Sequence, residues 1–345
     1  MTQPRGSAPA RAVHEGSMLA QSTALPKAHT IHTFFAMGCR VEVQIVHDAQ
    51  ADVAAVVEEA IAAIVSLFAL YEAELSRFLP QSGLSRLNRA AGTGAVHVTP
   101  LLCAITADAL IAAAATDGLF DPTLGTVLAH LGYDRPFPFP TLRDDGAIPA
   151  LLPQHRPDGW REIIVDQRAE TMTLPTGIAL DFGGIGKGWT VDRAAEHLRE
   201  IPGVHGGLVN AGGDLRVWGA APDEDPAWTV GVEAPDDRAR DCAILAVNDR
   251  AVATSSTAYR RWRRGERWIH HVLDPRTGQP ATTNLVSVTV IGPSAAWAEI
   301  HAKVALISGI EAGIAYLTRQ CGYTGLCITT DGTQRGTAGM KAYQQ

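Results

Sequence analysis

The sequence predicts an α+β fold, in which mixed or antiparallel sheets carry inserted helices within a single unit. Short runs of apolar or alternating residues dominate the second half of the chain, and no regular strand–helix–strand repetition is apparent. The composition is 46% hydrophobic and 19% charged over 345 residues, as in a globular protein with a sizeable core.

The formal net charge of −7 argues against a nucleic-acid partner, because binding to a phosphate backbone needs a basic face. Four arginines surround Trp262, at Arg260, Arg261, Arg263 and Arg264. We expect a solvent-exposed loop there, and an interaction surface is the alternative. The five cysteines are scattered and include no Cys-x-x-Cys pair, so neither a disulfide framework nor a zinc site is indicated.

Residues 1–30 are rich in Ala, Pro, Ser, Gln and Thr and contain no apolar run long enough for a signal-peptide core or a membrane span. We therefore expect a disordered N-terminal lead over 1–30, one folded domain over 31–335 and a tail over 336–345. The expected location is the cytoplasm, with no membrane span.

The first elements are two strands within residues 33–46, separated by a turn at Met37-Gly38. A long helix over 51–74 follows, because its apolar positions keep the three-four spacing of a buried stripe. Pro80 and Gly83 then break the helical pattern, and Ser82 is the expected N-cap of a short helical turn.

A second helix is expected over 100–116, opened by Thr99-Pro100 in the N-cap and first helical positions. Residues 119–125 read as an exposed turn, and residues 132–158, dense in Pro, Asp and Arg, as a long connecting loop. A hairpin formed by residues 163–166 and 171–174 leads into a glycine-rich stretch.

That stretch, residues 179–192, reads as a strand, a turn and a helix. Four of six consecutive positions are glycine, namely Gly183, Gly184, Gly186 and Gly188. Backbone N–H groups can approach an anion closely there, and both the helix N-terminus and Lys187 add positive charge. The alternative is a tight turn that only packs the helix on a sheet, because neither standard phosphate-loop pattern is present.

Strands dominate the remainder of the chain. We expect them at 207–218 with a glycine turn inside, and then at 228–232, 243–247, 251–256, 267–278 and 286–291. A helix over 295–307 and a last strand over 324–329 close the domain.

Several turns place acids, amides or hydroxyls beside glycines or at strand ends, where binding sites are commonly built. These residues are Asp121, Asp181, Asn210, Asp214, Thr254, Ser255 and Asp274. Each of them alone can equally be explained by turn chemistry. His270 and His271 are adjacent in a strand, so only one of the two imidazoles can face a given pocket. Glu299 and Lys303 are spaced for a helical ion pair, which can be a simple surface pair.

Read together and in order, these motifs resemble the ApbE family of FAD:protein FMN transferases. The matching segments are Met37-Gly38, 76–88, 117–125, 179–192, 210–214, 253–255, 271–278 and the helix over 295–307. The resemblance covers residues 31–330. It implies an ApbE-like, T-fold-like single unit that acts as a transferase. This enzyme moves FMN from FAD to a Thr or Ser hydroxyl of a partner flavoprotein, with release of AMP.

The resemblance also implies roles for individual residues. His271 falls at the position of the base for the acceptor hydroxyl, and Asp274 is assigned with it to the catalytic set. The residues assigned to FAD are Met37, Phe78, Leu119, Phe120, Asp121, Asp181, Lys187, Asn210, Gly212, Gly213, Thr254, Ser255 and Val272. Two alternatives stay open: an FAD-binding protein without transferase activity, and an FAD pyrophosphatase that yields FMN and AMP.

The sequence departs from the family at the metal site. The resemblance implies magnesium ligands near the Gly184 carbonyl and at the positions of Glu299 and Lys303, but an ammonium has no acceptor and cannot ligate a cation. Glu299 can still ligate a hard cation, so bound magnesium stays an alternative. We expect Lys303 to take over the charge of the metal, assisted by Lys187, and the competing interpretation is that Lys303 repels the metal and marks an inactive enzyme. We also expect Glu299 to hold Lys303 through an ion pair.

Overall fold

The computed structural model describes residues 26–137, 156–222 and 225–345. Most of the predicted disordered lead and of the predicted 132–158 loop therefore lies outside the described residues. The first strand, β1 (Lys27–Ala36), begins before the predicted domain boundary at residue 31.

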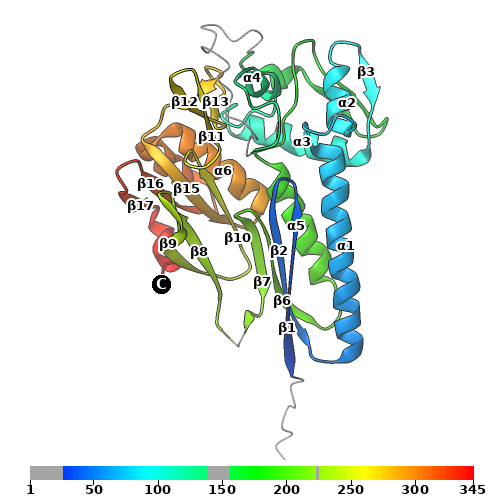
Figure 1. Cartoon of the computed structure of the whole chain (residues 1–345), viewed down its shortest axis with the longest axis vertical. Coiled ribbons are helices and arrows are strands. Elements are labelled where there is room, and N and C mark those ends of the chain that lie inside the picture. The colour runs from blue at the N-terminus through cyan, green and yellow to red at the C-terminus, as the bar shows by residue number, and fades with distance from the viewer. Residues whose placement is uncertain (1–25, 138–155, 223–224) are drawn as a thin grey trace, which may run out of the picture.

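An eight-stranded sheet forms the centre of the fold (Figure 1). Each pair of neighbouring strands in it is antiparallel. In spatial order the strands are β1, β2 (Cys39–Asp48), β6 (Val204–Ala211), β7 (Asp214–Gly219), β10 (Ala251–Ser256), β15 (Leu285–Gly292), β16 (Thr324–Thr329) and β17 (Gln334–Gly336). Together with the helices that pack on it, this sheet confirms the predicted α+β class.

Four helices pack against one face of the sheet (Figure 1). They are α1 (Ala51–Leu75), α5 (Gly186–Arg199), α6 (Ala295–Ser308) and α7 (Ile310–Arg319). By length and composition alone, α1 could cross a bilayer. Its stripe of Val57, Ile61, Ile64 and Phe68 is buried in the core between α1, α5 and β2. The absence of a membrane span stays a prediction.

The opposite face of the sheet is covered by a hairpin of β8 (Trp228–Ala234) and β9 (Asp237–Val247). Its buried residues Val230 and Leu245 pack in one cluster with Leu215 and Val217 of β7. The predicted tail is not a free end, because its 3-10 helix (Ala338–Ala342) buries Met340 in the same cluster.

A smaller helical region adjoins the sheet and supplies one wall of the site. It contains α2 (Gly83–Arg89), α3 (Pro100–Ala115), α4 (Gly125–His130), the 3-10 helix Gly159–Glu162 and a small sheet of β3 (Ala95–His97), β5 (Thr171–Thr173) and β4 (Ile164–Asp166). Two predicted caps are confirmed: Ser82 Oγ accepts from Ser85 N at 2.9 Å, and Thr99 Oγ1 accepts from Leu102 N at 3.2 Å.

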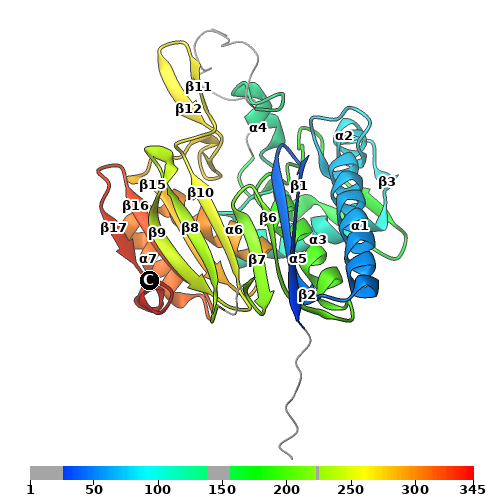
Figure 2. The same ribbon diagram turned by 60° about the horizontal axis from the view of Figure 1, so that its bottom comes forward.

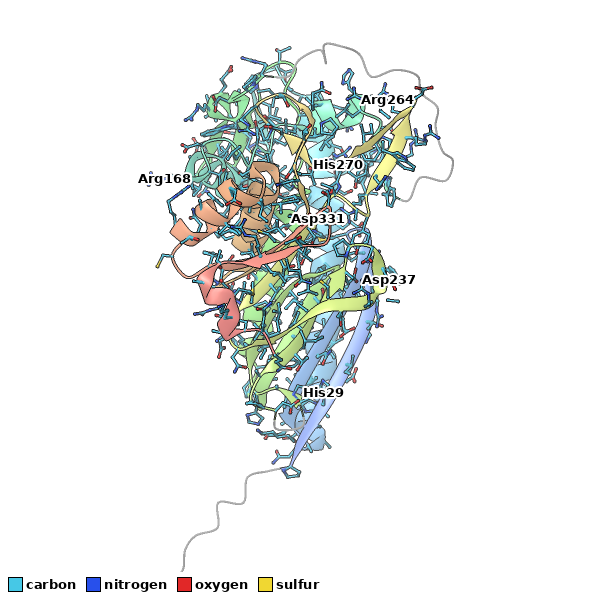
Figure 3. All side chains as sticks on the ribbon, turned by 90° about the vertical axis from the view of Figure 1, so that its left-hand side faces the viewer. His29, Arg168, Asp237, Arg264, His270 and Asp331 are labelled. Carbon is cyan, nitrogen blue, oxygen red and sulfur yellow. The ribbon has the colours of Figure 1, made fainter. Side chains whose placement is uncertain are left out.

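The arginine-rich segment is not a loop. It forms a hairpin of β11 (Arg261–Arg264) and β12 (Arg267–His270), which projects at the end of the molecule that carries α4 (Figure 2). Arg264 lies at the far end of this hairpin and His270 at its base (Figure 3). Trp262 is buried and donates to the Leu131 carbonyl at 2.9 Å, so the hairpin is anchored to the segment after α4. The short pair β13 (Leu273–Asp274) and β14 (Gln279–Pro280) follows.

Other differences from the sequence expectations are local. The predicted strand before the glycines is a single parallel bridge between Ala179 and Leu124. Helices α4 and α7 were not predicted, and β17 follows the strand that we expected to be the last. The strand β17 is only three residues long, too short for a periodic pattern to reveal it.

Candidate functional site

The glycine turn is the centre of the candidate site. Asp181 Oδ1 accepts from Gly183 N at 2.8 Å, and Gly186 N donates to the Phe182 carbonyl at 2.7 Å, which fixes the path of the turn into α5. The N-cap residue Ile185 makes no side-chain cap, and Glu299 of α6 instead accepts from Gly188 N in the first turn of α5. The dipole of α5 leaves partial positive charge at this point.

Other elements approach two of the glycines closely, and the backbone contact at Gly188 requires glycine there. A Cβ built on Gly184 would lie 1.9 Å from Lys303 Nζ, and one built on Gly188 would lie 2.5 Å from the carbonyl oxygen of Ala295. The first contact brings a side chain of α6 onto the turn, and the second brings the backbones of α5 and α6 together. The glycines thus serve close packing as well as ligand approach.

Lys187 is held between two carboxylates. Its Nζ lies 2.5 Å from Asp214 Oδ2 and 2.8 Å from Glu299 Oε1, and Glu299 Oε2 also accepts from Gly188 N at 3.1 Å. Burial opposes the charge of Lys187, but the two carboxylates outweigh burial and raise its pKa. Burial and the neighbouring Glu299 raise the pKa of Asp214. The charge of Lys187 is therefore neutralised within the protein.

Lys303 is arranged differently. It lies one helical turn after Glu299 on α6, and its ammonium lies against Gly184. In the described parts of the chain, no carboxylate lies within ion-pair distance of Lys303 Nζ. Burial lowers the pKa of Lys303, an effect that Glu299 and Asp181 only partly oppose. The expected Glu299–Lys303 ion pair is wrong, because Glu299 reaches across to Lys187 on α5.

A cleft opens beside the glycine turn, with an empty volume of about 1120 Å³ including its open mouth. Its walls come from the β1–β2 turn, the α1–α2 connection, the segment after α4, the glycine turn and α6. A smaller chamber of about 390 Å³ adjoins it. The two spaces share Leu128, Asp181, His271 and Lys303 in their linings. The imidazole of His271 and the ammonium of Lys303 therefore lie together where the cleft and the chamber meet.

His271, as predicted, lines the cleft, whereas His270 is absent from its lining. The Nδ1 atom of His271 lies 3.4 Å from the Arg260 carbonyl. We assign the ring proton to Nδ1 on the basis of that carbonyl, which leaves Nε2 as a proton acceptor. Burial, together with the charges of Arg260 and Lys303, lowers the pKa of His271 well below its usual value. The imidazole is therefore neutral at neutral pH and able to act as a base.

Sequence reasoning missed Arg77, Tyr133 and Arg260 as lining residues. The Arg77 guanidinium forms an ion pair with Asp181 and lies 4.2 Å from the centroid of the Phe78 ring and 4.8 Å from that of Tyr133. The signal for Arg77 was available, since it precedes Phe78 in the polar segment after α1. Arg260 was assigned to the arginine-rich loop, and Tyr133 lay in the segment with no readable pattern.

With this geometry in hand, the comparisons with known proteins identify the family. The model of the ApbE family matches residues 37–327. The chain belongs to the ApbE family. An FAD:protein FMN transferase of Treponema pallidum is 31% identical over 88% of this chain and 84% of its own. Another from Klebsiella pneumoniae is 31% identical over 76% of this chain and 80% of its own.

Solved ApbE structures show the same fold. The ApbE protein of Thermotoga maritima superposes with a TM-score of 0.78 at 24% identity, over 92% of this chain and all of that one. The flavin transferase ApbE of Vibrio cholerae superposes with a TM-score of 0.73 at 24% identity, again over 92% of this chain.

Most residues that the ApbE resemblance assigns to FAD surround the two connected spaces. Met37, Phe78, Asp181 and Lys187 line the cleft, and Leu119, Phe120 and Asp121 line the smaller chamber with Gly184. The segments meet because Asp181 N donates to the Pro122 carbonyl at 2.8 Å. The side chain of Asp121 accepts from both Thr123 N and Thr123 Oγ1, which fixes the shape of its own turn.

The other assigned residues lie outside both linings. Asn210 Oδ1 accepts from Gly213 N at 2.8 Å in the β6–β7 turn that also contains Gly212. Thr254 bonds to Thr289 across two strands at 2.9 Å. Ser255 and Val272 are buried, and Asp274 Oδ2 lies 2.7 Å from Arg276 Nη2 in the turn after β13. None of these seven residues lines the cleft or the chamber, and their assigned roles stay predictions.

The ApbE family implies a magnesium ion, and the residues of this chain do not fit one. Among the described residues, no group of three His, Cys, Asp or Glu side chains could hold a metal. Both oxygens of Glu299 accept hydrogen bonds, from Lys187 and from Gly188 N. A divalent cation beside Gly184 would also meet the ammonium of Lys303.

Proposed function

We propose that this protein is an FAD:protein FMN transferase that moves FMN from FAD to a hydroxyl of a partner flavoprotein. Family membership and relatives with that name support the reaction. The observation that carries the proposal is the joint position of His271 and Lys303, a neutral imidazole and an ammonium where the cleft and its inner chamber meet.

The lining of the cleft suits FAD. Phe78 and Tyr133 provide aromatic surface at one wall, and the glycine turn with Lys303 provides a cationic region at another. A dinucleotide with a ring system and a central pyrophosphate has the matching chemistry.

In the proposed reaction, the oxygen of a Thr or Ser hydroxyl of the acceptor attacks the phosphorus on the riboflavin side of FAD. A bond forms between that oxygen and phosphorus, and the bond from the same phosphorus to the bridging oxygen breaks. AMP leaves with the bridging oxygen, and Nε2 of His271 takes the hydroxyl proton. Positioning and charge neutralisation supply most of the catalysis in phosphoryl-type transfer.

The experiment combines the protein, FAD and a candidate acceptor flavoprotein. Fluorescence of the acceptor in a denaturing gel and a mass increase equal to FMN are the expected results, with AMP released in equal amount. The control acceptor has its target Thr or Ser replaced by Ala. AMP release without labelling would instead indicate a pyrophosphatase, and FAD binding with neither product would indicate a binding protein.

A further inference from the structure

The cleft contains two buried lysines whose charges are in different states. Lys187 contacts Asp214 and Glu299 and is neutralised by them. Lys303 lies beside the same carboxylates, yet no ion pair forms with it in the part of the chain that the structure describes. Burying an ammonium without a partner is costly, so a protein retains one where a ligand supplies the missing negative charge.

Lys303 lies where its charge can reach a ligand in the cleft or in the inner chamber. Its side chain lines both the cleft and the inner chamber, and its ammonium lies against Gly184, which has no side chain to displace it. The nearby Asp181 is paired with Arg77. Lys303, Arg260 and the glycine turn at the start of α5 are therefore the groups of the cleft lining that can attract an anion.

We infer that Lys303 binds the pyrophosphate of FAD directly, so that this protein binds FAD and transfers FMN without a divalent cation. The inference rests on the proposed function and adds to it the identity of the group that neutralises the pyrophosphate. Lys303 supplies one positive charge and up to three N–H donors to the pyrophosphate. The side chain at this position therefore does not have to be a metal ligand. Lys187 does not share this task, contrary to the expectation from the sequence, because Asp214 and Glu299 already neutralise it.

The test measures FAD affinity by titration calorimetry in EDTA and again with excess magnesium chloride. The native protein should bind FAD equally in both conditions. Lys303→Met removes the charge with little change in length and should weaken binding about 10- to 100-fold, as expected for loss of a hydrogen bond to a charged group. Lys303→Arg should recover part of that loss. Lys341→Met, at an exposed lysine far along the chain, is the matched control and should bind as the native protein does.

Inorganic pyrophosphate provides a second readout that does not depend on transfer. In EDTA it should compete with FAD for the native protein and fail to compete measurably for Lys303→Met. A native protein that binds FAD only after magnesium is added overturns the inference and leaves the proposed function standing. Unchanged FAD affinity in a folded Lys303→Met variant also overturns it. If FAD binds in neither condition and no FMN is transferred, the inference and the proposed function fall together.

Discussion

At the scale of single residues, His271 is distinguished from its neighbour by what each imidazole faces. His271 lines the cleft with Nδ1 directed to the Arg260 carbonyl, whereas Nδ1 of His270 is buried without a partner among the described residues. Strand alternation predicted that only one of the two would face the site, and the ApbE motif indicated which one. The structure adds the reason that the imidazole is neutral, which is burial beside Arg260 and Lys303.

His271→Ala should keep FAD affinity within a few-fold of native and lower FMN transfer by about 10²- to 10⁴-fold, the usual contribution of a general base. His270→Ala is the matched control and should transfer at a near-native rate. Calorimetric FAD binding and the rate of acceptor labelling separate the two effects. Equal losses of transfer in both variants, with both folded, would contradict the assignment.

The acid limb of the pH profile gives an independent check. A base must be unprotonated to act, and the pKa of His271 lies well below the ordinary value of 6.5. The ratio kcat/KM for FAD reports the free enzyme, so it should stay level as pH falls to 6.5 and decline only at lower pH. A limb centred above pH 6.5 would show that another group takes the proton.

The residue scale also shows where sequence reasoning stopped. The spacing of Glu299 and Lys303 places both on one face of α6, and the sequence predicted this correctly. Spacing along one helix does not show whether a residue of another helix pairs with the same carboxylate. Lys187 of α5 lies within 2.8 Å of Glu299 and takes that carboxylate, because α5 and α6 cross closely at this point.

At the scale of elements, the α5–α6 contact determines the geometry of the site. Asp192 of α5 accepts from Ala295 N at 2.9 Å and from Ala296 N at 3.0 Å, so it caps the first turn of α6. It also pairs with Arg216 of β7 at 2.9 Å. These bonds and the close approach at Gly188 fix the position of α6 relative to α5. They therefore fix Glu299 and Lys303 relative to Lys187.

Gly188→Ala should therefore destabilise the protein by about 1–3 kcal/mol, the usual cost of overpacking, because the new methyl group would meet the backbone of Ala295 and Ala296. Gly186→Ala is the matched control in the same turn of α5, where the nearest atom to a built Cβ is 3.6 Å away. It should be neutral or stabilise by about 0.4–1 kcal/mol. Urea unfolding measures both, and equal changes would refute the packing argument.

Elements with a strong period or cap were predictable from the sequence, and elements defined by tertiary contacts were not. The stripe of α1 and the Thr99 cap of α3 are visible as local patterns. The β11–β12 hairpin carries one buried residue in each strand, Trp262 and Ile269, among charged neighbours. The sequence of such a segment resembles that of a solvated loop. The tertiary hydrogen bond from Trp262 to the Leu131 carbonyl, which anchors the hairpin, is not visible in the sequence.

At the scale of the whole molecule, the site joins segments that are far apart in the chain. The lining of the cleft runs from Met37 in the β1–β2 turn to Lys303 in α6. The sequence motifs identified several of these segments, since glycines and strand-end acids mark turns. Their assembly depends on contacts such as Asp181 N to the Pro122 carbonyl, which no local pattern contains. A bound FAD would therefore contact segments from both ends of this range and hold them together.

Lys303→Met should stabilise the free protein and reduce the further stabilisation that FAD gives. In the free protein, burial lowers the pKa of Lys303, so the folded state holds this proton less tightly than the unfolded chain. The charge opposes folding at neutral pH, and its replacement by Met should raise the midpoint of thermal unfolding. FAD at 100 times its dissociation constant stabilises the native fold by about 2.7 kcal/mol. If the variant binds 10- to 100-fold more weakly, the same FAD concentration contributes about 0.4–1.4 kcal/mol.

Thermal melts in EDTA, with and without FAD, measure both effects, and Lys341→Met should alter neither. A variant that melts below the native protein without FAD, or that keeps the full shift with FAD, would show that Lys303 serves the fold rather than the ligand.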